Sequence, residues 1–496
     1  MEYRSTRSDN YRVCSAEAVL QGLAPDGGLY LPVTLPEFNW QDCLQRDTLG
    51  MAKMILSALL PDIPDMDALV ERAYTGKFET EELTPLVRVG DRFVLELFRG
   101  PTSAFKDVAL CMLPQLMTAA KSAKGEEKDI MILTATSGDT GKAALAGFQD
   151  VPGIRICVFY PEGGVSSVQR AQMVTQEGAN VTVAAVRGNF DDAQTGVKQI
   201  FTACRDKALP VVLSSANSIN IGRLAPQITY YFAAYRELLN RGEIVLGDQV
   251  NFAVPTGNFG NILAGFLAKK LGLPVGKLIC ASNDNDVLTE FLKTGRYNRI
   301  RLFHKTKSPS MDILVSSNLE RLLYLLSGDC DLVRALMEQL SREGRYHVPP
   351  YLLTRIQNQF FGGTCGDLSA LDTIQSVWQE KGYLMDTHTA TGWKVAEDYV
   401  NQAGDQRPMV VLSTASAYKF PAAVLTAITA GDKRDLMGWT SHMLKDAKGD
   451  EFAMMAQLEA LTGVPIPAGL RDLQSKPQRH TAVIDKEEML SFVLGL

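Results

Sequence analysis

The chain has 496 residues, of which 46% are hydrophobic and 21% are charged, and its formal net charge is −6. This length is too great for one hydrophobic core and predicts two or three domains, while the ordinary balance of apolar and charged residues argues against disorder. The negative charge argues against a nucleic-acid-binding surface. No stretch approaches the roughly 20 apolar residues of a membrane span, and no leader pattern opens the chain. We therefore expect a cytoplasmic protein.

Residues 1–90 combine short helical patterns with turns. From residue 91 onward, short apolar runs alternate with segments of helical apolar spacing. Strands are expected at 92–98, 129–136, 155–160, 180–186, 209–215, 250–256, 277–282 and 409–415, and helices at 107–117, 141–149, 190–206 and 226–242. This alternation is typical of α/β proteins with parallel sheets. We therefore expect two parallel-sheet domains preceded by an N-terminal region.

The eight cysteines show no CxxC spacing, and neither an HExxH nor an EF-hand pattern occurs. A zinc or calcium site therefore has little support, and we expect no metal. Cys157 and Cys280 lie in apolar runs, which favours reduced cysteines buried in the core.

The stretch AVPTGNFGNILAG, residues 253–265, is predicted to be a strand end, a Gly/Asn turn and a helix start. Bare backbone N–H groups at such a turn can bind a phosphate. The chain contains neither GxxxxGK[ST] nor GxGxxG, which disfavours ATP and dinucleotides. A monoester phosphate would fit the loop 256–261. An ordinary turn without a ligand is the alternative.

A lysine in FRGPTSAFKD, residues 98–107, is a candidate nucleophile. Lys106 precedes an apolar helix start, and a partly buried lysine loses its proton more easily, as a Schiff base with an aldehyde requires. Cations are also mildly disfavoured at helix N-termini, so a lysine there suggests a specific use. The alternative is a surface lysine whose stem lies along apolar neighbours.

Two further stretches place hydroxyl groups at predicted strand ends. TATSGDTGKAAL, residues 134–145, offers bare N–H groups and hydroxyls for a carboxylate or phosphate, or simply a helix cap. LSTAS, residues 412–416, ends a buried strand with hydroxyls that could meet a ring nitrogen, or that are a plain strand terminus.

In chain order, the lysine at 98–107, the loop at 134–145, the loop at 253–265 and the strand end at 412–416 resemble the fold-type-II pyridoxal phosphate enzymes, the family of tryptophan synthase β. The finer resemblance is to the threonine synthases in their long form. It covers nearly the whole chain and rests also on YRSTR (3–7), GLAPDGGLYLP (22–32), SSANSINIGRLAPQ (214–227), SPSMDILVSSNLERLL (308–323) and DTHTATG (386–392). The resemblance implies an N-terminal, mainly helical domain at 1–90, a large cofactor-binding domain at 91–125 and 236–496, and a small mobile domain at 126–235.

The resemblance also implies a cofactor, pyridoxal 5'-phosphate, bound covalently by Lys106, which would later move protons. Asp139 would lie near the cofactor's ring hydroxyl. Thr414 would face the pyridine nitrogen, although strand register leaves Ser413 as the alternative. The cofactor phosphate would be bound by Gly257, Asn258, Phe259, Gly260 and Asn261.

The substrate implied by the resemblance is O-phospho-L-homoserine. The reaction would eliminate its phosphate from the γ-carbon and add water at the β-carbon, giving L-threonine. Arg223 suits a phosphate because a guanidinium can bind two oxygens at once. The substrate-binding residues would be Ser137, Gly138, Thr140, Asn217, Ser218 and Arg223, with His388 at a further family position.

This chain departs from the family pattern in three stretches, GPTSAFKD, DTHTATG and STASAYKF, where relatives usually read GPTLAFKD, DPHTAVG and STAHPAKF. These departures, at residue 387 and at 416–418 above all, leave two alternatives open. One is a related phospho-lyase that gives 2-oxobutyrate, and the other is a non-catalytic cofactor-binding relative. We expect a monomer, with a dimer as the alternative, and neither nucleic acid nor membrane as a partner.

Overall fold

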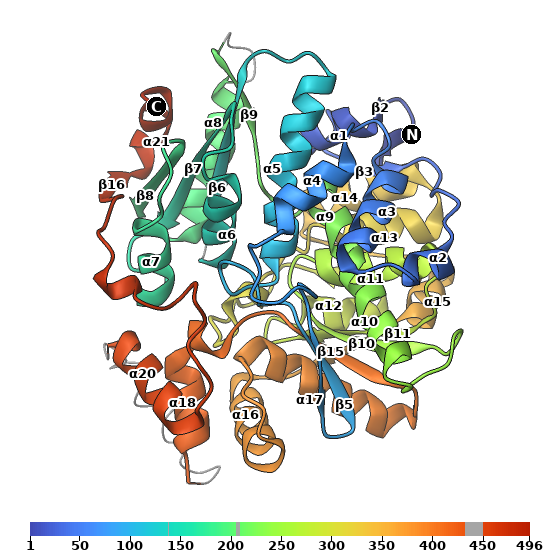
Figure 1. Ribbon diagram of the computed structural model, residues 1–496. Coiled ribbons are helices and arrows are strands. Elements are labelled where there is room, and N and C mark those ends of the chain that lie inside the picture. The colour runs from blue at the N-terminus through green and yellow to red at the C-terminus, as the bar shows by residue number, and fades with distance from the viewer. Residues whose placement is uncertain (137, 205–208, 432–449) are drawn as a thin grey trace.

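The computed structural model describes residues 1–136, 138–204, 209–431 and 450–496. Two separate sheets dominate it (Figure 1). The larger has the strand order β14 (Phe360–Thr364), β11 (Val275–Ser282), β10 (Val250–Pro255), β15 (Met409–Ser413), β5 (Arg92–Glu96) and β4 (Leu86–Val89). The smaller has the order β16 (Ala482–Asp485), β8 (Val181–Arg187), β7 (Ile154–Pro161), β6 (Asp129–Ala135) and β9 (Val211–Ser214). Neighbouring strands run parallel, except that β4 is antiparallel to β5.

The strands expected from the sequence are confirmed. They could be predicted because most of them are buried on both faces and are therefore continuous apolar runs in the sequence. Along β6, Ile130 and Ile132 belong to the largest hydrophobic core, which lies between the two sheets, whereas Met131 and Leu133 belong to a separate core. That separate core lies behind the smaller sheet, under α8 (Phe190–Cys204) and α21 (Met489–Leu494).

The outer face of the larger sheet is covered by α17 (Thr387–Ala403). Helix α16 (Asp367–Lys381) packs against α17, α18 (Pro421–Thr429) packs against α16, and α20 (Glu451–Thr462) packs against α18. The inner side of the sheet meets α10 (Ile228–Asn240) and α11 (Gly260–Lys270). The other elements of this half are α12 (Val287–Thr294), β12 (Arg296–Asn298), η2 (Pro309–Met311), α13 (Leu319–Ser327), α14 (Cys330–Glu343), β13 (Arg345–His347), α15 (Pro350–Gln359), η3 (Ala417–Lys419) and η4 (Leu473–Ser475).

The N-terminal region contains the helices α1 (Ser15–Gln21), α2 (Trp40–Leu44), α3 (Thr48–Leu59) and α4 (Met66–Tyr74). It also holds an antiparallel sheet of β2 (Arg12–Cys14), β1 (Glu2–Ser5) and β3 (Tyr30–Pro32), which the sequence did not predict. These strands have only three or four residues, too few for a periodic pattern to be recognised.

Three elements pair or pack across the domain limits that were expected from the sequence. Strand β4 lies within the expected N-terminal domain 1–90 but pairs with the larger sheet. Strand β16 lies within the expected segment 236–496 but forms the edge of the smaller sheet, parallel to β8. Helix α10 begins in the segment 126–235, yet its apolar face packs against α3. For β16 the pairing partner is remote in the chain and leaves no local signal, whereas β4 and β5 form a hairpin across the expected limit.

A central helix, α5 (Lys106–Ala123), connects the two halves of the protein (Figure 1). It packs against α6 (Asp139–Phe148), which follows the smaller sheet's β6, and a Cβ at Gly147 would stand 2.0 Å from the carbonyl oxygen of Leu110. Only a glycine allows so close an approach of two helix backbones. The elements not yet named are α7 (Ser167–Val174), α9 (Ile221–Leu224), η1 (Ala225–Gln227) and η5 (Lys486–Glu488).

Candidate active site

The candidate residues gather at the carboxyl ends of parallel strands, where ligand sites of open α/β sheets form. In the larger sheet β10, β15 and β5 are neighbours, and their carboxyl ends lead to the loop 256–259, to Thr414 and to Lys106. The backbone N–H of Phe105 donates to the carbonyl oxygen of Thr414 at 2.9 Å, so these segments touch. The carboxyl ends of β6 and β9 in the smaller sheet lead to Gly138 and to the loop 215–220.

Lys106 is the first residue of α5, and its amine lies in a half-buried polar contact. Its Nζ donates to Oγ of Ser310 at 3.3 Å and lies 5.6 Å from the centre of the Phe105 ring. Burial lowers the pKa of the Lys106 ammonium to about 8, with Lys419 and Arg223 lowering it further against the opposing effect of Asp139. An appreciable fraction of this lysine is therefore a neutral, nucleophilic amine near neutral pH.

The loop 257–261 presents a row of backbone donors. The N–H groups of these residues have no hydrogen-bond partner within the described ranges. Phe259 takes the left-handed conformation with φ 61°, which turns the loop into α11. A Cβ at Gly257 would lie 2.6 Å from the carbonyl oxygen of Ser310, so only glycine fits there. Bare N–H groups at a helix N-terminus form an anion site.

Asn261 adds a side-chain donor to this loop. Its Oδ1 accepts from the hydroxyls of Tyr230 at 2.6 Å and Tyr231 at 3.0 Å, which fixes the orientation of the amide. Its Nδ2 is buried and has no partner among the described residues. Buried donors of this kind are rare in folded proteins unless a ligand or water satisfies them.

Arg223 is a buried cation without a carboxylate partner among the described residues. Its Nη1 donates to the carbonyl oxygen of Ala216, while its Nε has no partner in the described part of the chain. Burial lowers the pKa of the Arg223 guanidinium to about 10. An uncompensated buried cation is costly, so this arrangement favours an anion as its partner.

The loop that holds Asn217 and Ser218 lies against the loop 257–261. Asn318 Nδ2 donates to the carbonyl oxygens of Ser218 at 3.2 Å and of Asn258 at 3.0 Å and so joins the two loops. The side chain of Asn217 is exposed. The structure thus brings the loop of Asn217 and Ser218 beside the candidate phosphate loop.

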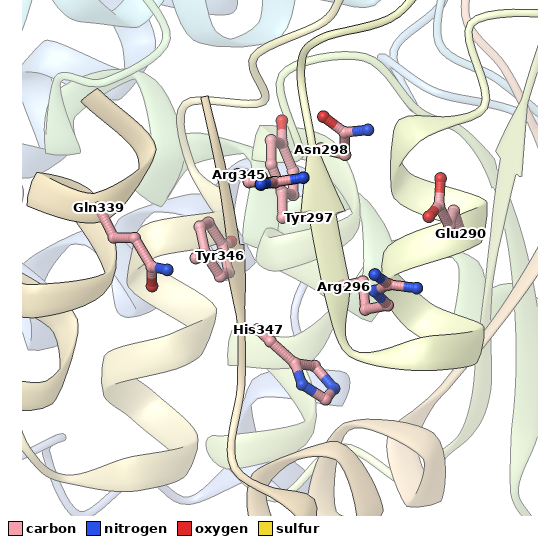
Figure 2. A pocket seen from close by; sticks show the side chains of 8 residues that line it. All are labelled: Glu290, Arg296, Tyr297, Asn298, Gln339, Arg345, Tyr346 and His347. Carbon is pink, nitrogen blue, oxygen red and sulfur yellow. The ribbon is translucent and has the colours of Figure 1, made fainter. Parts of the chain in front are cut away.

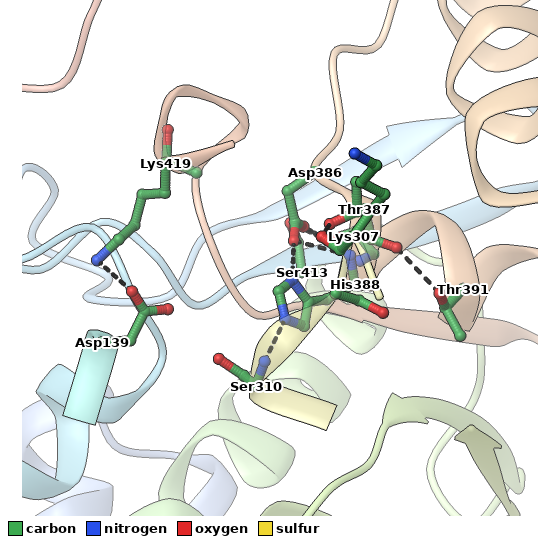
Figure 3. Close-up of polar contacts among 12 residues, drawn as sticks. Asp139, Lys307, Ser310, Asp386, Thr387, His388, Thr391, Ser413 and Lys419 are labelled. Atoms are coloured by element: carbon green, nitrogen blue, oxygen red, sulfur yellow. Dashed lines mark hydrogen bonds and ion pairs between the residues drawn. The ribbon is translucent and has the colours of Figure 1, made fainter. Parts of the chain in front are cut away.

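The first turn of α6 carries Gly138, Asp139 and Thr140, whereas Ser137 lies outside the described residues. Gly138 has φ 138°, and a Cβ there would lie 2.4 Å from the side chain of Gln169. Asp139 Oδ1 lies 2.9 Å from Lys419 Nζ, and both side chains are buried (Figure 3). Lys419 was missed by sequence reasoning, since nothing in its local pattern marks a buried lysine.

Ser413 and Thr414 are distinguished by their contacts. Ser413 Oγ lies 2.9 Å from Oγ1 of Thr389 on α17, behind the larger sheet. Thr414 is buried and follows the parity of Leu412, which faces the core between the sheets. The alternation of side chains along β15 therefore places Thr414 on the opposite face from Ser413.

The departures from the family pattern make local contacts. Thr387 donates through Oγ1 to the carbonyl oxygen of Lys307 at 2.7 Å. The backbone N–H of Ser416 donates to the carbonyl oxygen of Ser103 at 3.1 Å, and the Tyr418 hydroxyl donates to the carbonyl oxygen of Val464. These three residues therefore hold loops around the site together.

A hollow of about 340 Å³ lies away from this site, over the antiparallel pair β12–β13 (Figure 2). The stacked rings of Tyr297 and Tyr346 form its floor, with their centres 5.2 Å apart. Arg296, Arg345 and His347 are among the residues that line it. None of the candidate site residues lies there.

In the described part of the chain, no group of three or more His, Cys, Asp or Glu could hold a metal ion. All eight cysteines are unpaired, and six of them are buried. Among the helices of the described ranges, none is both long and apolar enough to cross a bilayer.

Comparison with known proteins agrees with this geometry. The sequence pattern of the pyridoxal-phosphate dependent enzymes matches residues 78–415, that of the threonine synthase N terminus matches 2–74, and that of the threonine synthase C-terminal region matches 389–493. Threonine synthase-like 1 of Homo sapiens is 39% identical over 83% of this chain. The chain spans only 58% of that relative's length.

Threonine synthase of Saccharomyces cerevisiae is 38% identical over 86% of this chain and 89% of its own length. The crystal structure of threonine synthase with bound pyridoxal phosphate from Brucella melitensis superimposes with a TM-score of 0.85 at 37% identity. That superposition covers 100% of this chain and 98% of the other.

Proposed function

Because this chain belongs to the threonine synthase family of pyridoxal-phosphate-dependent enzymes, we propose that it converts O-phospho-L-homoserine and water into L-threonine and phosphate. Family membership carries the coarser part of this statement, a pyridoxal-phosphate-dependent lyase. The substrate, the product and the role of each residue are the proposal.

The residues present fit pyridoxal phosphate as the cofactor. Lys106 supplies an amine that is partly neutral near neutral pH, as bond formation with the cofactor's aldehyde requires. The bare N–H groups of residues 257–261 and the unpartnered Nδ2 of Asn261 supply donors for its phosphate. Thr414 would offer a hydroxyl to the ring nitrogen, and a hydroxyl there leaves that nitrogen without a proton.

When bound, pyridoxal phosphate withdraws electrons from the α-carbon of an attached amino acid and so makes neighbouring protons acidic. The proton itself would be moved by Nζ of Lys106, whose lowered pKa suits both accepting and releasing it. Ser310 Oγ, at 3.3 Å from Nζ, would hold the amine in place between transfers. Asp139, kept ionised by Lys419, would supply a fixed negative charge beside these cations.

The observation that carries the proposal is Arg223, a buried guanidinium with an unpartnered Nε and no carboxylate partner in the described chain. The cofactor brings one phosphate, which the loop 257–261 would bind. Arg223 lies in α9, after β9, and its unpaired charge would be neutralised by a second anion. A substrate with its own phosphate supplies one, whereas serine or threonine does not.

The test is a product assay of the purified protein with O-phospho-L-homoserine and pyridoxal phosphate. Threonine, 2-oxobutyrate and inorganic phosphate are measured in the same samples. We expect threonine and phosphate in equal amounts. Phosphate with 2-oxobutyrate instead of threonine would contradict the proposal in favour of a phospho-lyase, and the absence of all three products would favour a non-catalytic relative.

A further inference from the structure

A series of hydrogen bonds leads from Lys106 into the interior of the larger half. Lys106 Nζ donates to Oγ of Ser310 at 3.3 Å, and the backbone N–H of Ser310 lies 3.2 Å from Nε2 of His388. Nδ1 of His388 lies 2.7 Å from Oδ2 of Asp386. Figure 3 shows the part of this series from Ser310 to Asp386. The proposed reaction so far uses neither His388 nor Asp386.

The directions of these bonds define one tautomer of His388. A backbone N–H can only donate, so Nε2 must accept from Ser310 and carry no proton. The ring proton therefore resides on Nδ1 and is donated to Asp386. The other tautomer would point an N–H group at the N–H of Ser310 and would leave two buried donors without an acceptor. A partner on the second ring nitrogen commonly selects a histidine tautomer in this way.

Asp386 is well placed to hold this tautomer. Its side chain is fully buried and caps α17, accepting from the backbone N–H groups of His388 at 2.9 Å and Thr389 at 3.1 Å. The N-terminus of a helix favours a negative charge. The His388 ring also packs against Phe420, with ring centres 4.9 Å apart, so its plane is fixed on a second side.

Ser310 lies between two parts of the candidate cofactor site. Its hydroxyl meets the amine of Lys106, and its carbonyl oxygen lies against Gly257 so closely that a Cβ there would stand 2.6 Å away. The backbone N–H of Ser310 donates to Nε2 of His388, and this hydrogen bond holds Ser310 in place. The hydroxyl of Ser310 therefore acts on the amine, whereas its carbonyl oxygen bounds the phosphate loop, so the two contacts can be tested separately.

We infer that His388, held in one tautomer by Asp386, is a positioning residue that sets the Ser310 hydroxyl against the Lys106 amine. By accepting one N–H of the amine, Ser310 turns the remaining positions on Nζ, including the lone pair of the neutral form, toward the open side of the site. The inference rests on the proposed cofactor chemistry but not on the identity of the amino-acid substrate.

The test measures cofactor affinity of the apoprotein with two probes. Pyridoxal 5'-phosphate can bond to Lys106, whereas pyridoxamine 5'-phosphate has the same ring and phosphate but no carbonyl. The variants are His388→Leu, Asp386→Ser, the double variant and His388→Gln. Serine is as good a helix cap as aspartate but is too short to reach Nδ1 of His388. The glutamine of His388→Gln keeps a side-chain oxygen that can accept from the N–H of Ser310.

The matched control is Thr391→Val. Thr391 lies buried on the same helix, one turn further on, and its hydroxyl donates only to the carbonyl oxygen of Thr387 among the described residues. We expect this control to bind both probes as the unaltered protein does. Thermal unfolding of each apoprotein verifies that the variant is folded before it is titrated.

We expect His388→Leu and Asp386→Ser each to weaken pyridoxal phosphate binding by about tenfold, the cost of a buried group left without its partner. Pyridoxamine phosphate binding changes little. The double variant loses no more affinity for pyridoxal phosphate than a single variant does, because both substitutions act through the same contact. His388→Gln recovers most of the affinity.

The inference is overturned if both single variants bind pyridoxal phosphate as Thr391→Val does, or if their losses add in the double variant. It is equally overturned if pyridoxamine phosphate loses as much as pyridoxal phosphate, since the phosphate loop would then have moved instead of the amine. The proposed function would fail separately, through the absence of threonine in the product assay of the unaltered protein.

Discussion

Lys419 Nζ lies 2.9 Å from Oδ1 of Asp139 with both side chains buried. Gln169 donates to the same oxygen at 2.9 Å, and Lys419 also donates to the carbonyl oxygen of Thr102 at 3.0 Å. Asp139 begins the helix after β6, whereas Lys419 follows β15. A buried ion pair thus joins the carboxyl ends of the two sheets at the candidate site.

Replacing one member of this pair leaves the other charge buried and unpaired. We expect Lys419→Met to lower the free energy of unfolding of the apoprotein by about 3–5 kcal/mol. The matched control is Lys394→Met, since Lys394 pairs at the surface with Glu397 and Asp398 and exposed pairs contribute about 0–1 kcal/mol. Urea unfolding followed by circular dichroism measures both. A Lys419→Met loss no larger than that of the control would show that the pair contributes little.

The same pair makes stability depend on acid pH. Burial alone would raise the pKa of the Asp139 carboxyl, but Lys419 and Lys106 outweigh burial and lower it. A lowered pKa in the folded state means that the unfolded chain binds the proton more readily, so stability falls as the pH drops below about 4. We expect Asp139→Asn, which cannot titrate, to flatten this part of the stability profile. An unchanged acid slope would contradict this assignment.

Lys106 gives the same direction of pH dependence at alkaline pH, although here it is burial that disfavours the charged form. Its folded-state pKa of about 8 lies below the ordinary value of 10.5, so between these values the unfolded chain carries a proton that the folded chain has lost. Stability of the apoprotein therefore rises with pH through this window. Lys106→Met removes a disfavoured charge and should stabilise the apoprotein at pH 7 by on the order of 1 kcal/mol, a gain that disappears near pH 10. Thermal unfolding across this pH range measures it, and a gain independent of pH would argue against the assignment.

The phosphate loop offers a pair of glycines for comparison. A Cβ at Gly257 would lie 2.6 Å from the carbonyl oxygen of Ser310, whereas a Cβ at Gly260 would lie an ordinary 3.5 Å from Nδ2 of Asn318. We expect Gly257→Ala to displace the turn and weaken pyridoxal phosphate binding by about tenfold or more. Gly260→Ala, as the control, should lose much less. Fluorescence titration of the apoprotein compares them, and equal losses would show that the crowding at Gly257 is not the cause.

The parts of the site that the sequence predicted share one physical origin. Lys106, Thr414 and the loop 257–261 all follow apolar strands, and parallel strands bring their carboxyl ends to one edge. The sequence analysis grouped them through the family resemblance, and the common edge of the sheet gives the physical reason why they lie together. The register of Ser413 could not be predicted, because it is set by a contact with Thr389 on a distant helix.

The features that escaped prediction depend on contacts between distant segments. Lys419 lies in a short turn and has no local sign of burial, since its partner Asp139 comes from the other sheet. Strand β16 has four residues and pairs with β8, whose position in the chain is remote. His388 was noticed as a family position, but its tautomer follows from Asp386 and Ser310 meeting at its two ring nitrogens.

Two buried arginines, Arg321 and Arg223, differ in their hydrogen-bond partners. We therefore expect their replacement to have different effects on the stability of the apoprotein. Arg321 donates to the carbonyl oxygens of Tyr30 and Ile219 and to Oδ1 of Asn318, whereas Arg223 leaves its Nε unpartnered in the described structure. Burial lowers the pKa of both guanidinium groups to about 10. Arg321 is therefore held by the fold, and Arg223 lacks a counter-charge that only an anion would bring.

We expect Arg223→Met to leave the apoprotein as stable as before or more stable, while raising the KM for O-phospho-L-homoserine by at least about tenfold. Arg321→Met should lower the free energy of unfolding by about 2–4 kcal/mol, because three acceptors lose their donor. Inorganic phosphate should protect the unaltered apoprotein against thermal unfolding more than it protects Arg223→Met, since a ligand stabilises only the state that binds it. Equal protection of both proteins by phosphate would remove Arg223 from the anion site.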